Sequence, residues 1–151
     1  DKDGVTAALV AAEMLATLKG AGVSVWQRLD ELAITHGVYA NHPISIRFDA
    51  DPARVTALME RVQATPPTHL GGAVVANAGP VGLGSLPATA GLHLVTEDDT
   101  QVIVRPSGTE PKIKAYIEVI EPVTHDDVTG ARARADQRLS TVVADVQTLL
   151  Q

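Results

Sequence analysis

Three segments near the end of the chain, in which apolar and polar residues alternate, restrict its fold most strongly. The stretches GLHLVT and TQVIVR, separated by EDD, have the pattern of two strands joined in a hairpin. Residues 112–120 continue the alternation and place Ile113, Ala115, Ile117 and Val119 on one face. The chain is therefore expected to form a sheet with one buried face, which other elements must cover.

Helical periodicity on both sides of these segments predicts two helices that can cover this face. Asp51 and Pro52 form a cap and a first-turn proline for a helix that should end before Pro66 and bury Val55, Leu58, Met59 and Val62. Thr124 and Asp127 form a capping pattern before a long amphipathic helix. Its apolar residues recur at spacings of three and four: Val128, Ala131, Ala135, Leu139, Val142, Val146 and Leu149.

The stretch HPISIRF adds a strand, because Ile44, Ile46 and Phe48 alternate with Ser45 and Arg47. Residues 65–91 are rich in glycine and proline and predict a loop with one strand near Ala73 to Ala76, or alternatively a flexible tether. We expect an α+β fold with a mostly antiparallel sheet of four to five strands and helices on one face.

Residues 1–37 read as a helical pair. Asp3 caps a helix that ends at Gly20 and Gly22, and its apolar face consists of Val5, Ala8, Leu9, Ala12, Leu15 and Leu18. Ser24 and Gln27 form a capping box for a second helix that stops at Gly37. Two short helices cannot bury both apolar faces by themselves, so the pair needs the rest of the chain or a missing domain. Since the chain starts at this helix without Met or leader, we expect it to be part of a longer protein.

Composition narrows the classes of function. The net charge of −6 and the 3% aromatic content disfavour a nucleic-acid-binding module, and the chain contains no cysteine for disulfides or thiolate metal sites. Apolar stretches are interrupted well before the ~20 residues that a membrane helix needs, and no export signal is visible. We expect a cytoplasmic protein with neither nucleic-acid nor membrane partners. His36, His42, His69, His93 and His125 lack metal-ligand spacing and are read as solvated or core histidines.

The loop RPSGTEP, residues 105–111, has the residue types of an anion site. Arg105 offers a planar fork of donors, and Ser107 and Thr109 offer hydroxyls. Gly108 can take positive φ and lets successive amides converge on one anion. Pro106 and Pro111 restrict the loop, Lys112 and Lys114 add positive charge, and Glu110 could orient Arg105 or a lysine. A plain hairpin connection of ordinary turn residues is the open alternative.

RPSGTEP followed by an alternating strand resembles the phosphate-binding loop in the C-terminal domain of the α-D-phosphohexomutase family, the phosphoglucomutases and phosphomannomutases. DKDGVTAALVAAEML and THGVYANHPISIR are similar to the end of that family's third domain and the linker into its fourth. The DKDG start resembles the branch with phosphopentomutase-type enzymes and related bacterial phosphomannomutases. The resemblance implies a helical remnant of the third domain at 1–38 and a TATA-box-binding-protein-like C-terminal domain at 39–151.

The same resemblance implies a function. The family moves a phosphoryl group between two hydroxyls of a sugar, and its fourth domain holds the phosphate that is not transferred. Arg105, Ser107, Gly108 and Thr109 match that loop, and Lys114 stands where some members have a second basic residue. The family's phosphoserine stretch, its Asp-rich Mg²⁺ loop and its sugar-selecting loop have no match, and Asp1 and Asp3 are read as helix-start acids.

We therefore expect the chain to bind the phosphate of a sugar phosphate, to contain no catalytic residue and to be inactive alone. Mg²⁺ would be held elsewhere in the full-length enzyme, and the partners would be the substrate and the remaining domains. Glucose, mannose, glucosamine and pentose phosphates all remain candidate substrates, so a phosphopentomutase or phosphoglucosamine mutase relative stays open. A stand-alone anion-binding regulatory module is a second alternative. Arg132, Arg134 and Arg138 are read as a solvated face, or alternatively as a docking surface.

Overall fold

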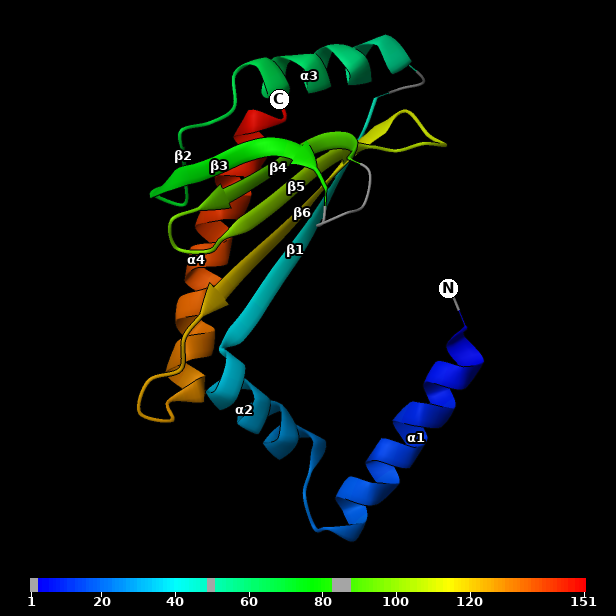
Figure 1. The fold of residues 1–151 in the computed structure, drawn as a ribbon, viewed down its shortest axis with the longest axis vertical. Helices are drawn as coiled ribbons and strands as arrows, with labels where there is room; N and C mark the ends of the chain where they lie inside the picture. Colours follow the sequence, from blue (N-terminus) through cyan, green and yellow to red (C-terminus); the bar gives the residue numbers. More distant parts are fainter. Residues whose placement is uncertain (1–2, 49–50, 83–87) are drawn as a thin grey trace.

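The fold was analysed in a computed structural model that describes residues 3–48, 51–82 and 88–151. Within these residues an antiparallel sheet of six strands is combined with four helices, so the α+β prediction is confirmed (Figure 1). The elements are, in chain order, α1 (Gly4–Gly20), α2 (Val25–His36), β1 (Val38–Arg47), α3 (Pro52–Ala64), β2 (His69–Leu70), β3 (Ala73–Val81), β4 (Thr89–Thr96), β5 (Gln101–Pro106), β6 (Lys112–Glu121) and α4 (Val128–Leu149).

The strands lie in the order β1-β6-β5-β4-β3-β2, with β2 at one edge. β1 pairs with β6 along its whole length, from Val38 opposite Glu121 to Arg47 opposite Lys112. β4, β5 and β6 follow one another through short connections and pair in that order between β1 and β3, and the β4–β5 pair is the hairpin that their alternation predicts.

The sheet has more strands than expected because residues 65–91 are not mainly loop. β3 extends from Ala73 to Val81, and the short strand β2 pairs with it. Two register shifts interrupt the pairing of β3 with β4, which explains why the glycine- and proline-rich sequence shows no clear alternation. Residues 83–87 of the predicted loop lie outside the described residues.

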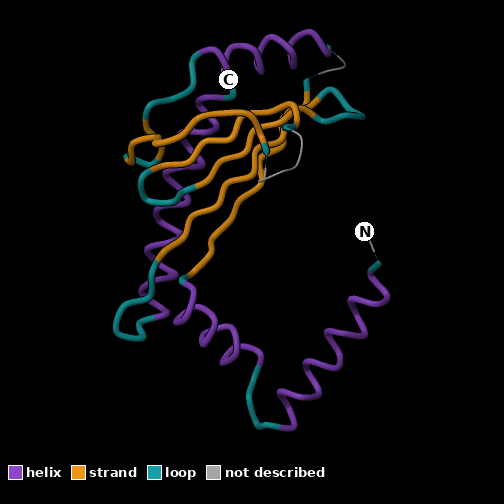
Figure 2. The backbone as a smooth tube through the Cα atoms, in the orientation of Figure 1, coloured by secondary structure: helices purple, strands orange, loops and turns teal. Residues whose placement is uncertain are grey.

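One face of the sheet is covered by α3 and α4, while no helix of the described residues covers the other face (Figure 2). α4 packs on β1 and β6, and α3 packs on β4, β5 and β6. The aliphatic core between them includes Val62, Leu94, Val102, Val104, Ile113, Ala115, Ile117, Val119, Val142 and Val146, each at most 2% exposed. Residues that alternate with these on β5 and β6 face the helix-free side, and that side includes Arg105 and Lys114.

The helix starts follow the predicted caps with one exception. Asp3 and Asp51 accept hydrogen bonds from the amides of their first turns, and Ser24 and Gln27 form the full capping box. At α4 the cap is Asp127 itself, which accepts from the Gly130 amide, while Thr124 lies before the helix. His125 and Asp126 adopt positive φ and turn the chain between Thr124 and the cap, which the sequence pattern did not indicate.

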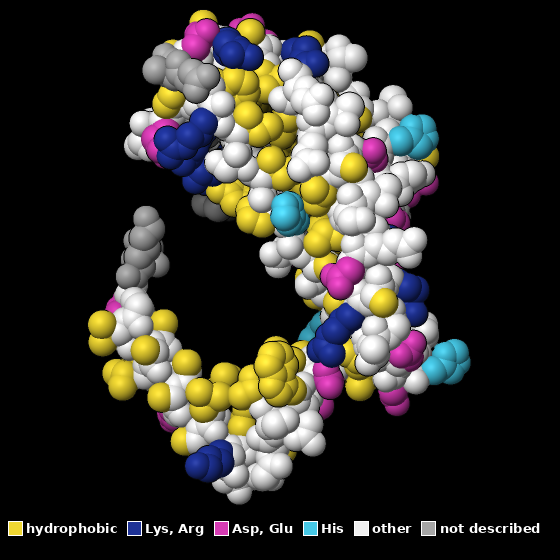
Figure 3. Space-filling view, turned by 180° about the vertical axis from the view of Figure 1, so that it is seen from behind, with side chains coloured by type: hydrophobic (Ala, Val, Ile, Leu, Met, Phe, Trp, Pro, Cys, Tyr) yellow, Lys and Arg dark blue, Asp and Glu magenta, His cyan; other side chains and the backbone are white. Residues whose placement is uncertain are grey.

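α1 buries none of its residues in this chain. Val5 is 76% exposed and Leu9 is 67% exposed, and both lie on the predicted apolar face. Figure 3 shows hydrophobic side chains along this helix, away from the sheet. None of the described helices is individually long and apolar enough to cross a membrane, and α1 and α2 pass such a test only as a pair bent by 96°.

Arg132 and Arg134 of α4 are exposed, as expected of a solvated face, whereas Arg138 is half-buried, and all three form ion pairs. Arg138 pairs with Glu121 at 2.7 Å and with Asp98 at 2.7 Å, and Arg134 pairs with Glu121 at 2.8 Å. Burial alone would raise the pKa of Glu121, but hydrogen bonds from both arginines and their charges lower it overall. This network ties α4 to the end of β6. Arg132 contacts Asp30 of α2 at 2.6 Å instead.

Candidate functional site

The predicted anion loop joins β5 to β6 and is fixed at its base. The Ser107 amide donates to the Lys112 carbonyl at 2.9 Å, and the Lys112 amide donates to the Glu110 carbonyl at 2.7 Å. The Phe48 amide donates to the Pro111 carbonyl at 2.9 Å, which links the loop to the end of β1. The two ends of the loop are therefore held by the sheet, while its tip is exposed at Gly108 and Thr109.

The tip has several hydrogen-bond donors without acceptors. In the part of the chain that the structure describes, the amides of Gly108, Thr109 and Glu110 make no hydrogen bond. The hydroxyls of Ser107 and Thr109 have no partner there either. A pocket of about 400 Å³ lies between this loop and the start of α3, and Ser107, Gly108 and Thr109 line it. Successive unbonded amides with nearby hydroxyls are an arrangement that binds anions.

Gly108 does not adopt the positive φ that a glycine permits. It is absent from the glycines with positive φ, so the turn itself does not require glycine. A Cβ built at this position would meet no atom within 4 Å among the described residues. A side chain could therefore be accommodated in this chain, and a glycine is needed only if another molecule approaches the backbone closely.

Glu110 is directed away from the unbonded amides. Its carboxylate contacts Arg47 at 2.8 Å and also pairs with Lys112. The hydrogen bond from Lys112 and the charges of both cations lower the pKa of Glu110 and keep it ionised. The expectation that Glu110 orients a lysine fits this contact, whereas Arg105 is not its partner. Glu110 therefore pairs with Arg47 and Lys112 and not with the other cations near the loop.

Two such cations are Arg105 and Lys114. They lie opposite each other on β5 and β6. Among residues 3–48, 51–82 and 88–151, no carboxylate forms a salt bridge with either of them. The Arg105 guanidinium stacks on Tyr116, with Cζ 5.5 Å from the ring centroid, and Nη2 donates to the Tyr116 hydroxyl at 3.3 Å. Tyr116 is a contact that the sequence analysis missed.

The five predicted site residues thus form two neighbouring groups. Ser107, Gly108 and Thr109 line the pocket against α3, whereas Arg105 and Lys114 lie on the helix-free face of the sheet beside the loop. Arg105 does not line that pocket. The two groups adjoin at the end of β5, where Arg105 is followed by Pro106, which lines the pocket.

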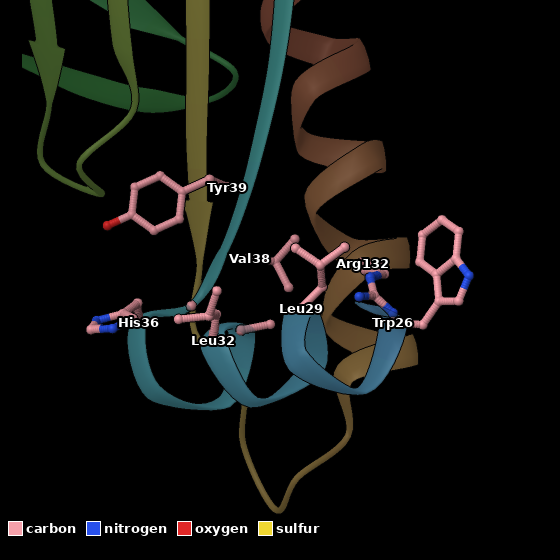
Figure 4. A pocket seen from close by; sticks show the side chains of 9 residues that line it. Trp26, Leu29, Leu32, His36, Val38, Tyr39 and Arg132 are labelled. Carbon is pink, nitrogen blue, oxygen red and sulfur yellow. The ribbon is translucent and has the colours of Figure 1, made fainter. Parts of the chain in front are cut away.

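Another hollow, of about 860 Å³, lies between α2 and the start of β1 and is mainly apolar. Figure 4 shows Leu29, Leu32 and Val38 within it, with Trp26 on one side and Tyr39 and His36 on the other. Trp26 is 75% exposed, which is unusual for such a large apolar side chain. Because this hollow offers few polar groups, it has the character of a packing surface rather than of an anion site.

Metal ligands are not gathered in the part of the chain that the structure describes. In the described residues no group of three or more His, Asp or Glu side chains is placed to hold a metal ion. Asp1, one of the two acids of the DKDG start, lies outside these residues. Asp3 caps α1 through two backbone amides and the Thr6 hydroxyl, which accounts for its position without a metal.

Comparison with known proteins assigns the fold and the loop to a family. The model of "Phosphoglucomutase/phosphomannomutase, C-terminal domain" matches residues 49–135, which include the whole loop. The chain belongs to the phosphoglucomutase/phosphomannomutase family. Its C-terminal-domain identity agrees with the resemblance noted in RPSGTEP.

Two individual proteins extend this comparison. The chain is 32% identical over 121 residues to a probable phosphomannomutase of Haemophilus influenzae, an alignment that covers 78% of this chain and 24% of that protein. Its fold is similar to the crystal structure of the exocytosis-sensitive phosphoprotein parafusin, a phosphoglucomutase from Paramecium, in its open form. That match has a TM-score of 0.58 at 19% identity and covers 99% of this chain and 28% of the other. The chain thus spans about a quarter of the length of the relatives it matches.

Proposed function

We propose that this chain is the C-terminal substrate-phosphate-binding part of a phosphohexomutase of the phosphoglucomutase/phosphomannomutase type. The loop at 105–111 would hold the phosphate that is not transferred. The observation that carries this proposal is the combination of three unbonded loop amides with the unpaired cations Arg105 and Lys114 at the same hairpin.

The physical role of such a site is orientation. A guanidinium can pair with two phosphate oxygens, and the amides and hydroxyls of the loop can take the others. Lys114 contributes a point charge from the neighbouring strand. A phosphate held at several points fixes the attached sugar relative to the reacting groups, and such orientation can supply about 7–11 kcal/mol of a barrier in favourable cases.

The chemical step is assigned to the rest of a longer enzyme. The chain would supply no catalytic residue and would be inactive by itself. Mg²⁺ would be bound by another domain, since the described residues offer no ligand set for it. The substrate would be a sugar phosphate of the glucose, mannose, glucosamine or pentose series, in a cytoplasmic enzyme.

The helical pair at the start of the chain supports a division of the chain between two domains of the longer enzyme. Residues 1–38 would belong to the preceding third domain, and residues 39–151 would form the C-terminal domain. α1 exposes its apolar residues, and the hollow beside α2 is apolar, so both offer surfaces for packing against the remaining domains. A stand-alone anion-binding module would leave these surfaces without a purpose.

The test is phosphate binding by the 151-residue chain after substitution of Arg105. Arg105→Ala should weaken binding of glucose 1-phosphate and of inorganic phosphate by at least about tenfold, because it removes a charge-assisted pair of hydrogen bonds. Folding should be unchanged, since the side chain is exposed. Arg28→Ala is the matched control, because Arg28 lies on α2 and pairs with Glu31. Equal losses in both variants would mean that binding is merely electrostatic and would contradict the proposal.

A further inference from the structure

Tyr116 has contacts that core packing does not explain. It alternates along β6 with Ala115 and Ile117, which are buried, yet Tyr116 itself is 40% exposed on the helix-free face. Its ring lies beneath the guanidinium of Arg105, and its hydroxyl accepts a hydrogen bond from Arg105 Nη2 at 3.3 Å. The ring therefore packs against the functional cation rather than against the core.

An exposed arginine at a strand end has many rotamers available. Fixing such a side chain costs conformational entropy, which a ligand would otherwise have to offset on binding. Stacking on an aromatic face and donation to its hydroxyl favour one orientation in advance. Since a guanidinium has five N–H donors and only one is engaged here, most remain available to an anion.

The Arg105 side chain is also directed toward one particular face of the sheet. Arg105 faces the side of the sheet that carries Lys114, not the pocket between the loop and α3. The neighbouring cations Arg47 and Lys112 both pair with the Glu110 carboxylate. Arg105 and Lys114, which form no salt bridge among the described residues, place positive charge on the helix-free face at the base of the loop.

We propose that Tyr116 is a positioning residue, which holds the Arg105 guanidinium beside Lys114 so that the phosphate reaches the loop from the helix-free face of the sheet. This inference rests on the proposed function, because it presumes that Arg105 binds the phosphate. Tyr116 acts through Arg105 and requires no contact with the ligand.

The electrostatics of the phenol agree with this arrangement. The hydrogen bond from Arg105 and the charges of Arg105 and Lys114 lower the pKa of Tyr116, although partial burial opposes them. A phosphate bound between these cations would add negative charge nearby and raise that pKa again. The phenol is thus a reporter of both the arginine and the anion.

The first measurement is the affinity of the 151-residue chain for inorganic phosphate, determined by titration calorimetry. Tyr116→Leu removes the ring and the hydroxyl and should weaken binding by about five- to tenfold, whereas Tyr116→Phe keeps the ring and should weaken it by about two- to threefold. Tyr39→Leu is the control, because Tyr39 is also exposed on a strand but lies opposite Ile120, at the far end of the β1–β6 pair. Its affinity should match that of the parent chain.

The second measurement is the pKa of the Tyr116 phenol, followed by tyrosinate absorbance. Tyr39→Phe leaves Tyr116 as the single tyrosine, since the chain contains two. Arg105→Ala and saturating phosphate should each raise this pKa. A purely structural tyrosine would show neither shift.

The outcomes separate the two proposals. If Arg105→Ala loses phosphate binding while Tyr116→Leu and Tyr116→Phe bind like the parent, the positioning role is refuted and the proposed function stands. If Arg105→Ala keeps its affinity, both fail. If Tyr116→Leu does not fold, Tyr116→Phe and the phenol pKa decide, and an unshifted pKa in Arg105→Ala overturns the inference.

Discussion

Replacing Gly108 by alanine tests whether glycine is needed at this position for folding or for binding a ligand. The glycine has no positive φ, and a Cβ there would have nothing within 4 Å in the described residues. Gly108→Ala should therefore leave the free energy of unfolding unchanged or raise it by about 0.4–1 kcal/mol, because alanine restricts the unfolded chain. Phosphate affinity should nevertheless fall by about tenfold or more, since the added methyl group stands where the anion approaches the loop amides.

Gly91→Ala is the matched control for this substitution. Gly91 has φ of 155°, and a Cβ there would lie 2.8 Å from the Val104 carbonyl oxygen and 2.7 Å from Val81 Cγ2. This substitution should destabilise the fold by about 2–4 kcal/mol, as backbone strain and overpacking combine. Denaturant unfolding measures the stability of both variants, and calorimetric titration with inorganic phosphate measures their binding. A stable Gly108→Ala chain with parental affinity would refute the reasoning, because the loop backbone would then not be a contact surface.

Two further predictions concern the rest of the chain. Glu121→Gln should lower the free energy of unfolding by about 2 kcal/mol at neutral pH, because it weakens charge-assisted hydrogen bonds with Arg134 and Arg138. Since the pKa of Glu121 is lowered from 4.5, the stabilisation by the ionised carboxylate is present above pH 4.5 and is lost as the pH falls through the folded-state pKa. If the denaturant midpoint of Glu121→Gln had the same pH dependence as that of the parent chain, the role of the network would be contradicted. A chain that begins at Ala21 should keep its stability within about 0.5 kcal/mol, because α1 buries no residue, and a larger loss in thermal or denaturant unfolding would mean that α1 packs on the sheet.

Helix caps and the alternation of apolar residues, which are local features of the sequence, predicted most of the fold. Caps such as Asp3, Ser24 and Asp51 are recognisable because they satisfy amides within one turn of their own helix. The strand at residues 112–120 alternates regularly, so its buried residues Ile113, Ala115, Ile117 and Val119 were identified correctly. β3 was underestimated because its register shifts and glycines remove the alternation on which such a prediction depends.

The candidate site was predicted less completely, for a related reason. The residue types of the loop are visible in RPSGTEP, and the phosphate hypothesis followed from them together with a family resemblance that the comparisons support. The sequence did not show that the site residues divide between the pocket and the helix-free face, because this division depends on which strands pair and in which register. Tyr116 approaches Arg105 only through that pairing, and Glu110 reaches Arg47 from a distant part of the chain.

The most direct test of the central claim is an amide NMR titration of the 151-residue chain with glucose 1-phosphate, inorganic phosphate and unphosphorylated glucose. The account predicts saturable shifts at Ser107, Gly108 and Thr109 with both phosphate-bearing ligands and none with glucose. It also predicts that these shifts disappear in Arg105→Ala. Amides that remain unperturbed at millimolar phosphate would contradict the account and leave residues 105–111 as an ordinary hairpin connection.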